Sequence, residues 1–354
     1  MNISVRVNAR ALRAVLGVVM MSLSGAAPTA PPKATFTTFD VPGDTFGINP
    51  KGITPGGEIT GSYCTAQFPT QFPCHGFVRD PKGDITTFDL PGDAFGTFPI
   101  AINPAGVITG FYIDANFVFH GFLRAPDGTL STFDGPSAIA TQPVGIDPRG
   151  FITGFWLDSN SNPHSFVRAP DGTFTSFDPA MNTNNSGVIN AAGAVTGSFA
   201  DNNGLTHGFL RAPDGAVTTF DAPSVCKTLN GTFATGIDSA GVIAGTYWDA
   251  GCVHFHGFLR ARDGAFTTID IHVPGTTDTE VDAINPEGAI SGIYFTSSRI
   301  FGFLRSPSSV VTTYSAPADS VGPNDAAVNP AGVITGFYID SSGGHGYVWT
   351  PEGK

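Results

Sequence analysis

The amino-acid sequence predicts an all-β fold, a seven-bladed β-propeller of four-stranded antiparallel blades. One unit of short strands repeats roughly every 45 residues, a period typical of propellers and solenoids. The last strand of the unit occurs seven times, at 37–40, 86–89, 131–134, 175–178, 218–221, 267–270 and 312–315. The chain begins with such a strand and ends one strand short. We therefore expect residues 34–40 to pair beside 346–349 and close a ring, which removes unpaired sheet edges.

Each repeat unit is predicted to form four strands, which are numbered here from the central channel outward. In the second unit the second strand is expected at 107–113, the third at 120–124 and the fourth at 129–134. An Asn-Pro-x-Gly turn should join the first strand to the second, and a Pro-Asp-Gly turn the third to the fourth. The turn Asn or Asp recurs at Asn49, Asn103, Asp147, Asn190, Asp238, Asn285 and Asn329. In this alignment the first blade alone carries an insertion, at 53–56.

Two further residue types recur on the strands. A glycine lies within every second strand, at Gly61, Gly110, Gly154, Gly197, Gly245, Gly292 and Gly336. Because a strand glycine usually marks a close approach, we expect a Phe from the neighbouring blade against it. An arginine ends the third strand at Arg79, Arg124, Arg168, Arg211, Arg260 and Arg305. These arginines are expected to be exposed edge charges near the Pro-Asp-Gly turn, each contributing about 0–1 kcal/mol.

A histidine on the third strand is followed by an aspartate on the fourth, and the hairpin between them should place the two side by side. The expected pairs are His75 with Asp89, His120 with Asp134, His164 with Asp178, His207 with Asp221, His256 with Asp270, and His345 with Asp40. The sixth blade has Phe301 and Ser315 instead. Such pairs can hold an imidazole in one tautomer or form a general base. Since six near-identical active sites in one chain are implausible, we interpret the pairs as structural.

The N-terminal residues 1–26 resemble a cleavable secretory signal. Arg6, Arg10 and Arg13 precede an apolar stretch at 14–23, which is too short to span a bilayer. Residues 27–33 are expected to be a linker, and 34–354 a single propeller domain. Loss of the three arginines would take the net charge from −12 to −15. The mature chain would be secreted or periplasmic and monomeric, and its acidity argues against nucleic-acid or anionic-membrane partners.

Four cysteines remain after the signal, and an even number in an oxidising compartment implies disulfides. We expect Cys64 to pair with Cys74, and Cys226 with Cys252. Both bridges would lie on the rim that also carries the histidines. An alternative use of Cys252 with His254 and His256 is a zinc site, but the expected disulfide and His–Asp pair compete for these ligands, so no metal or cofactor is predicted.

The repeat resembles that of the bacterial extracellular HAF-repeat proteins, named for a His-Ala-Phe tripeptide. The Gly-Ile-Asn element is similar to residues 47–49, 145–147 and 236–238, and the tripeptide to 120–122 and 164–166. The middle residue here is Gly or Ser rather than Ala, and Arg replaces the usual Trp except at Trp349. The resemblance implies export and a propeller-like repeat, and it supplies no catalytic residues.

The loops between second and third strands, and between fourth and first strands, vary in length and emerge on one rim, which we name the loop rim. Variable loops on a rigid frame are a common binding arrangement. Candidate ligand-binding residues at this rim are Tyr112, Asp114, Trp156, Asp158, Tyr247, Trp248, Tyr338 and Asp340. The aromatic rings among them could stack on sugars or serve as core packing. The Asp- and Asn-rich loops at 158–162 and 201–204 lack the distal Glu of a calcium loop, so solvated turns are favoured.

Nucleophile elbows, phosphate-binding loops and zinc-protease motifs are absent from the sequence. Glu58, Glu280, Glu287 and Glu352 are the only glutamates, and the sequence does not place them in the channel. We therefore expect a secreted, non-catalytic scaffold that binds a glycan or an extracellular protein through the loop rim. The alternatives are a propeller hydrolase or lyase with its site at the channel mouth, which rests on fold analogy, and a purely structural surface protein.

Overall fold

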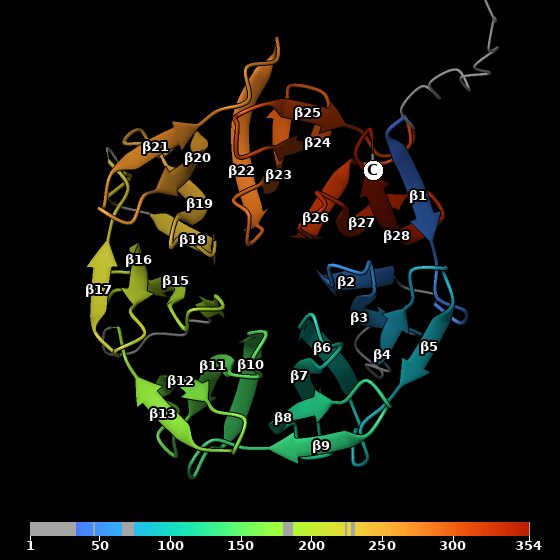
Figure 1. The fold of residues 1–354 in the computed structure, drawn as a ribbon, viewed down its shortest axis with the longest axis vertical. Helices are drawn as coiled ribbons and strands as arrows, with labels where there is room; N and C mark the ends of the chain where they lie inside the picture. The colour runs from blue at the N-terminus through green and yellow to red at the C-terminus, as the bar shows by residue number, and fades with distance from the viewer. Residues whose placement is uncertain are drawn as a thin grey trace, which may run out of the picture.

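The computed structural model describes residues 33–44, 47–65, 74–179, 187–223, 225–227 and 231–353. These residues form seven four-stranded antiparallel sheets arranged as a ring around a central channel (Figure 1). The predicted seven-bladed propeller is confirmed. The expected signal at 1–26 and nearly all of the linker lie outside the described residues. Within the described part, no helix has the length and apolarity needed to cross a membrane.

Each blade runs from an inner strand at the channel to an outer strand at the circumference. Blades 1 and 2 are β2 (Gly47–Ile53), β3 (Ile59–Cys64), β4 (Cys74–Arg79), β5 (Ile85–Phe88), and β6 (Gly96–Ile102), β7 (Ile108–Ile113), β8 (Phe119–Arg124), β9 (Leu130–Phe133). Blades 3 and 4 are β10 (Ala140–Ile146), β11 (Ile152–Leu157), β12 (Pro163–Arg168), β13 (Phe174–Phe177), and β14 (Gly187–Ile189), β15 (Val195–Ala200), β16 (Thr206–Arg211), β17 (Val217–Phe220). Blades 5 and 6 are β18 (Thr232–Ile237), β19 (Ile243–Trp248), β20 (Phe255–Arg260), β21 (Phe266–Ile269), and β22 (Thr276–Ile284), β23 (Ile290–Thr296), β24 (Ile300–Arg305), β25 (Val311–Tyr314).

Blade 7 joins the two ends of the chain. It consists of β26 (Pro323–Val328), β27 (Ile334–Asp340), β28 (Gly343–Thr350) and, as its outer strand, β1 (Thr35–Phe39). Strand β1 pairs antiparallel with β28 from Thr35 opposite Thr350 to Phe39 opposite Gly346. Figure 1 shows the two strands side by side, one at each end of the colour range. The expected closure of the ring is therefore confirmed.

The glycine of the second strand is explained by its own blade in six of the seven blades. A Cβ at Gly110 would overlap the carbonyl oxygen of Phe98 on the adjacent inner strand, and Gly61 and Gly154 face the carbonyls of Asn49 and Gln142 in the same way. A register shift in the inner strand, next to this contact, brings the two backbones together. The expectation of a Phe from the neighbouring blade is wrong at these positions.

The turn between first and second strands in blade 1 is formed by Thr54, and the alignment of Asn49 with the other turn residues is wrong. Thr54 Oγ1 accepts the backbone N–H of Glu58, and its carbonyl accepts that of Gly57. Asn49 lies within β2, opposite Ser62. The insertion expected at 53–56 is therefore the ordinary turn, displaced in the alignment by an Asn-Pro sequence that falls within a strand.

The turn asparagines link neighbouring blades. Each side-chain amide donates to the backbone carbonyl of the turn residue in the next blade. The donors and acceptors are Asn103 to Asp147 at 3.2 Å, Asn190 to Asp238 at 2.9 Å, Asn285 to Asn329 at 2.8 Å, and Asn329 to Thr54 at 3.2 Å. The last of these crosses the seam between blade 7 and blade 1. Asp147, Asp238 and Thr54 have no amide to donate, so the turns of blades 3, 5 and 1 lack this link.

The arginines that end the third strands also contact the neighbouring blade. Arg79 lies over the ring of Phe39 at 5.0 Å, and Arg124 over that of Phe88 at 5.0 Å, in each case a ring on the preceding outer strand. Arg168, Arg211 and Arg260 repeat this contact on Phe133, Phe177 and Phe220. The expected place near the turn after the third strand is confirmed, since Arg79 donates to the carbonyl of Asp80 and Arg124 to that of Ala125. The ring contacts add a packing role that the expectation of edge charges did not include. In blade 7, Trp349 stacks on Tyr314 instead, at 4.6 Å.

We predict that Asn329→Asp weakens the closure of the ring. Aspartate keeps the turn, since Asp147 and Asp238 occupy equivalent positions, but it cannot donate to the Thr54 carbonyl. The free energy of unfolding should fall by about 1–3 kcal/mol, the typical cost of leaving a buried polar group unpaired. Denaturant unfolding measures this change. The reverse substitution, Asp238→Asn, should leave the free energy of unfolding unchanged or raise it. If both variants lower the free energy of unfolding equally, the amide does not have the proposed role.

Candidate functional site

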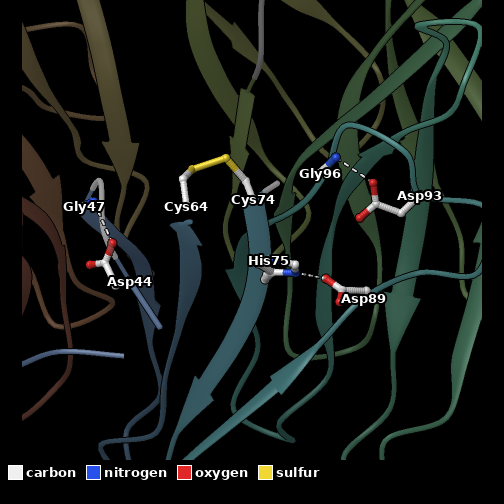
Figure 2. Close-up of a disulfide and its surroundings, with 8 residues drawn as sticks. All are labelled: Asp44, Gly47, Cys64, Cys74, His75, Asp89, Asp93 and Gly96. Atoms are coloured by element: carbon white, nitrogen blue, oxygen red, sulfur yellow. Dashed lines mark hydrogen bonds and ion pairs between the residues drawn. A yellow bond between two sulfur atoms is a disulfide. The ribbon is translucent and has the colours of Figure 1, made fainter. Parts of the chain in front are cut away.

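The loop rim carries the repeated histidines, and each lies against an aspartate of the adjacent outer strand end. The distance from His Nδ1 to the carboxylate is between 2.6 and 3.1 Å in the six pairs His75 with Asp89, His120 with Asp134, His164 with Asp178, His207 with Asp221, His256 with Asp270, and His345 with Asp40. Figure 2 shows the first of these pairs beside the Cys64–Cys74 disulfide. An ionised carboxylate only accepts, so Nδ1 carries the proton in each pair.

A second aspartate approaches the other ring nitrogen in four blades. Asp114, Asp158 and Asp201 lie 3.6–3.7 Å from Nε2 of His120, His164 and His207. In blade 7, Asp340 is 3.2 Å from Nε2 of His345. Burial opposes the charged form of His345, but its hydrogen bonds and attraction to Asp40 and Asp340 outweigh burial and raise its pKa. This arrangement repeats around the ring, which supports a structural role for the histidines.

The candidate aromatic residues are mostly used inside the blades. Tyr112, Tyr247 and Tyr338 are buried, and their rings lie 5.1–5.4 Å from the repeated histidine of the same blade. Trp156 stacks on His164 at 4.5 Å and donates to Ser176. These four rings pack against the structural histidines rather than line the pocket described below.

The candidate carboxylates shape loops. Asp114 and Asp158 each accept two backbone N–H groups of the loop that follows, and Asp340 accepts from Ser342. The hydrogen bonds from these backbone and side-chain donors lower the pKa of Asp114, of Asp158 and, to about 2, of Asp340. They are loop caps whose oxygens are already engaged.

Both predicted disulfides are confirmed. Cys64 is bonded to Cys74, and Cys226 to Cys252. The second bridge removes the thiolate that a zinc site at Cys252, His254 and His256 would require. Among the described residues, no group of three or more metal-binding side chains lies close enough to hold an ion.

One pocket at the inner end of the loop rim occurs between blades 5 and 6. It encloses about 310 Å³ and is lined by Phe233, Thr235, Thr246, Trp248, Phe255 and Glu280. Of the candidate ligand-binding residues, Trp248 lines this pocket. The rings of Trp248 and Phe255 lie 5.4 Å apart, and Phe255 meets Phe295 edge to face. The result is a half-buried aromatic pocket with a single carboxyl group.

The pocket walls are held by a disulfide and by an aspartate of β22. The backbone N–H of Cys226 donates to the carbonyl of Trp248, so the Cys226–Cys252 disulfide anchors the strand end that carries the indole. Asp278, at a second register shift of β22, accepts the N–H of Phe255 and lies 3.1 Å from Nδ1 of His254. Bulges of this kind redirect side chains near functional sites.

Glu280 lies two residues from Asp282, which faces the central channel together with Lys51, Ile100 and Val144. Burial raises the pKa of Glu280. Burial, and then the nearby charges of Asp325 and Glu280, raise the pKa of Asp282 well above its usual value. One carboxylate oxygen of Asp282 is buried without a hydrogen-bond partner among the described residues. The inner strand β22 thus places Glu280 in the pocket and Asp282 in the channel wall.

Asp325 lies behind the channel wall, between blades 6 and 7. Its Oδ1 accepts hydrogen bonds from the hydroxyls of Tyr314, at 2.5 Å, and Tyr347. Burial raises the pKa of Asp325 to about 7, although these hydrogen bonds oppose the shift. Its second oxygen has no partner in the described part of the chain. Tyr314, Tyr347, Asp325, Asp282 and Glu280 therefore form an unrepeated group of titratable side chains, which we call the acid cluster.

The acid cluster was not predicted, although the sequence carries a signal for it. Asp325 occupies the position held by Pro50, Pro99 and Pro143 in the first three blades. Tyr347 replaces the buried Phe of the six other third strands, and Tyr314 replaces an outer-strand Phe or Ile. Three apolar positions that become polar together indicate a buried hydrogen-bonded group.

No family model matches the chain, and no curated protein matches it. Solved structures share its fold. A catalytically inactive virginiamycin B lyase from Staphylococcus aureus, solved with quinupristin, is 14% identical with a TM-score of 0.59, and the match covers 89% of this chain and 99% of that chain. The β-propeller domain of the trilobed protease from Pyrococcus furiosus is 8% identical with a TM-score of 0.62, covering 86% and 96%. An oligogalacturonate lyase in complex with manganese is 11% identical with a TM-score of 0.58, covering 90% and 97%. At these identities the likeness shows the propeller fold alone.

We predict that Asp325 makes the protein less stable as pH rises from about 4 to about 7. Its folded pKa lies above its unfolded value, so the folded state holds the proton more tightly and loses that advantage as the proton leaves. The shift corresponds to roughly 4 kcal/mol at most. Denaturant unfolding across this pH range should show a smaller decline for Asp325→Asn than for the unmodified protein.

A matched control gives Tyr314 of blade 6, and Asp325 and Tyr347 of blade 7, the residues found at these positions in the first three blades. The triple variant Asp325→Pro, Tyr314→Phe and Tyr347→Phe removes the titrating group while restoring the common packing. It should lose the same part of the pH dependence. An unchanged pH profile in both variants would show that Asp325 titrates in its ordinary range.

Proposed function

We propose that the protein is a secreted, non-catalytic binding propeller that holds part of a glycan or of an extracellular protein in the pocket between blades 5 and 6. The observation that carries this proposal is the pocket itself: an aromatic, partly exposed cavity that interrupts a regular repeat. Its volume of about 310 Å³ lies at the lower end of the range for small-molecule sites.

The pocket residues differ from their counterparts in the other blades. The position of Trp248 is held elsewhere by Cys64, Ile113, Leu157, Ala200, Phe295 and Ile339, and that of Phe255 by Cys74, Phe119, Pro163, Thr206, Ile300 and Gly344. Packing within a blade therefore does not require an indole at Trp248. A half-exposed ring that the fold does not need supports a binding role.

Export is supported by the two disulfides, which are typical of oxidising compartments. The signal peptide at 1–26, and assignment to the HAF-repeat proteins, remain predictions of the sequence. Oligomeric state and partners belong to the same proposal, which takes the protein as a monomer that presents its loop rim to the ligand.

An acid–base enzyme is the second candidate, favoured by the acid cluster. Asp282 faces the channel and interacts with Asp325, so one group can hold a proton near neutral pH while another accepts one. Two structural neighbours are named as lyases, of virginiamycin B and of oligogalacturonate. A polysaccharide and cyclic-peptide turnover screen tests this candidate, and any activity should disappear in Asp282→Asn.

We predict that Trp248→Leu abolishes ligand retention without unfolding the protein. Leucine is the residue that blade 3 has at this position, Leu157, so the strand should form normally. A glycan array and a pull-down from extracellular and envelope fractions identify ligands, and the variant should bind them at least about tenfold more weakly.

The control for this experiment is Trp156→Leu, which removes an indole from the same rim outside the pocket. If a ligand binds both variants with the same affinity as the unmodified protein, it is recognised elsewhere on the propeller.

A further inference from the structure

We propose that the pocket between blades 5 and 6 is selective for an organic ammonium ion, held between aromatic faces and the carboxylate of Glu280. This inference rests on the proposed function and specifies the chemical group that the pocket recognises.

The aromatic walls provide the first part of the argument. Phe233, Trp248 and Phe255 contribute three rings to one small pocket, and Trp248 and Phe255 are paired on adjacent strands of blade 5. The faces of aromatic rings carry negative potential and attract cations whose centres lie within about 6 Å. Rings arranged around a cavity are the usual device for binding ammonium groups in proteins.

The carboxylate provides the second part. Glu280 lines the pocket, and no lysine, arginine or histidine is among the lining residues. Partial burial disfavours the negative charge of Glu280 and raises its pKa. A bound cation would offset this cost, because opposite charges attract strongly where water is partly excluded.

Glu280 is the one ionisable side chain among the lining residues. Asp282, two residues along the same strand, faces the channel instead, and burial raises its pKa and that of Asp325, so neither is needed for the negative charge of the pocket. The opposite wall is uncharged, and the hydroxyl of Thr246 already accepts the backbone N–H of Val281. An anionic ligand would be repelled by Glu280, and a neutral ligand would leave its charge uncompensated.

The other blades show that the fold does not require a carboxyl group at the position of Glu280. The position of Glu280 is occupied by Asn49, Phe98, Gln142, Phe233 and Asn324 in five other blades. Each is uncharged. A carboxylate at the one position that faces an aromatic pocket is therefore a local specialisation.

The test is calorimetric titration of the mature chain with tetramethylammonium, choline and butylammonium, and with 3,3-dimethyl-1-butanol as the uncharged analogue of choline. Glucose and galactose serve as neutral sugars. We expect the cations to bind, and choline to bind about tenfold more tightly than its uncharged analogue. Comparing the affinities for butylammonium and tetramethylammonium shows whether the pocket prefers a primary or a quaternary ammonium ion.

The key variant is Glu280→Gln, which keeps the shape of the side chain and gives blade 6 the residue of blade 3. It should reduce cation affinity at least about tenfold, and Trp248→Leu should do the same. The matched control, Gln142→Glu, places a carboxylate at the equivalent position of blade 3 and should create no new site. Circular dichroism verifies that each variant is folded.

The outcomes separate this inference from the proposed function. Cation binding that depends on both Glu280 and Trp248 supports it. If Glu280→Gln binds cations as tightly as the unmodified protein, the inference is overturned. A preference for neutral sugars that Trp248→Leu abolishes also overturns it, but that result leaves the proposed binding role intact. If the pocket variants alter the binding of no ligand found by array or pull-down, both proposals are wrong.

Discussion

The structure depends on one constraint: seven sheets must close into a circle, so every blade has to fit two neighbours. The antiparallel ladder between β1 and β28 satisfies this constraint by building one blade from both ends of the chain. On one rim, the turn asparagines tie neighbouring blades through their side-chain amides, including Asn329 across the seam. Nearer the circumference, guanidinium groups lie on the aromatic rings of the preceding blade. Closure is therefore distributed over small contacts that repeat around the ring.

Function can be located where the repeat is broken, because repeated residues are explained by the ring. Blades 5 and 6 depart from it at Trp248, Phe255 and Glu280, and a disulfide and Asp278 hold the departing residues in place. Blade 7 departs from it at Asp325 and Tyr347, and blade 6 at Tyr314. Both departures adjoin β22, which has two register shifts and joins the pocket to the channel wall.

The sequence predicted what is local and repeated: the blade count, the closure, both disulfides and the residues that form the His–Asp pairs. It failed where a side chain's partner lies in another blade. The ring beneath each arginine belongs to the preceding outer strand, and Asp325 meets Tyr314 only after two blades pack together. Asn49 was misplaced for a different reason, because Thr54 performs the turn chemistry that asparagine performs elsewhere. Trp248 was among the candidates because aromatic residues at strand exits are visible in the sequence, whereas Glu280, on the opposite wall of the pocket, comes from the next blade.

The turn asparagines also bear on how the protein ages. Deamidation of asparagine begins with attack on the side-chain amide by the backbone nitrogen of the following residue, and a proline nitrogen carries no hydrogen for that reaction. Asn103, Asn285 and Asn329 each precede proline, so their amides are chemically protected. Asn190 precedes Ala191 and lacks this protection. Among the turn asparagines, deamidation should therefore reach the contact between blades 4 and 5 first and leave the seam intact.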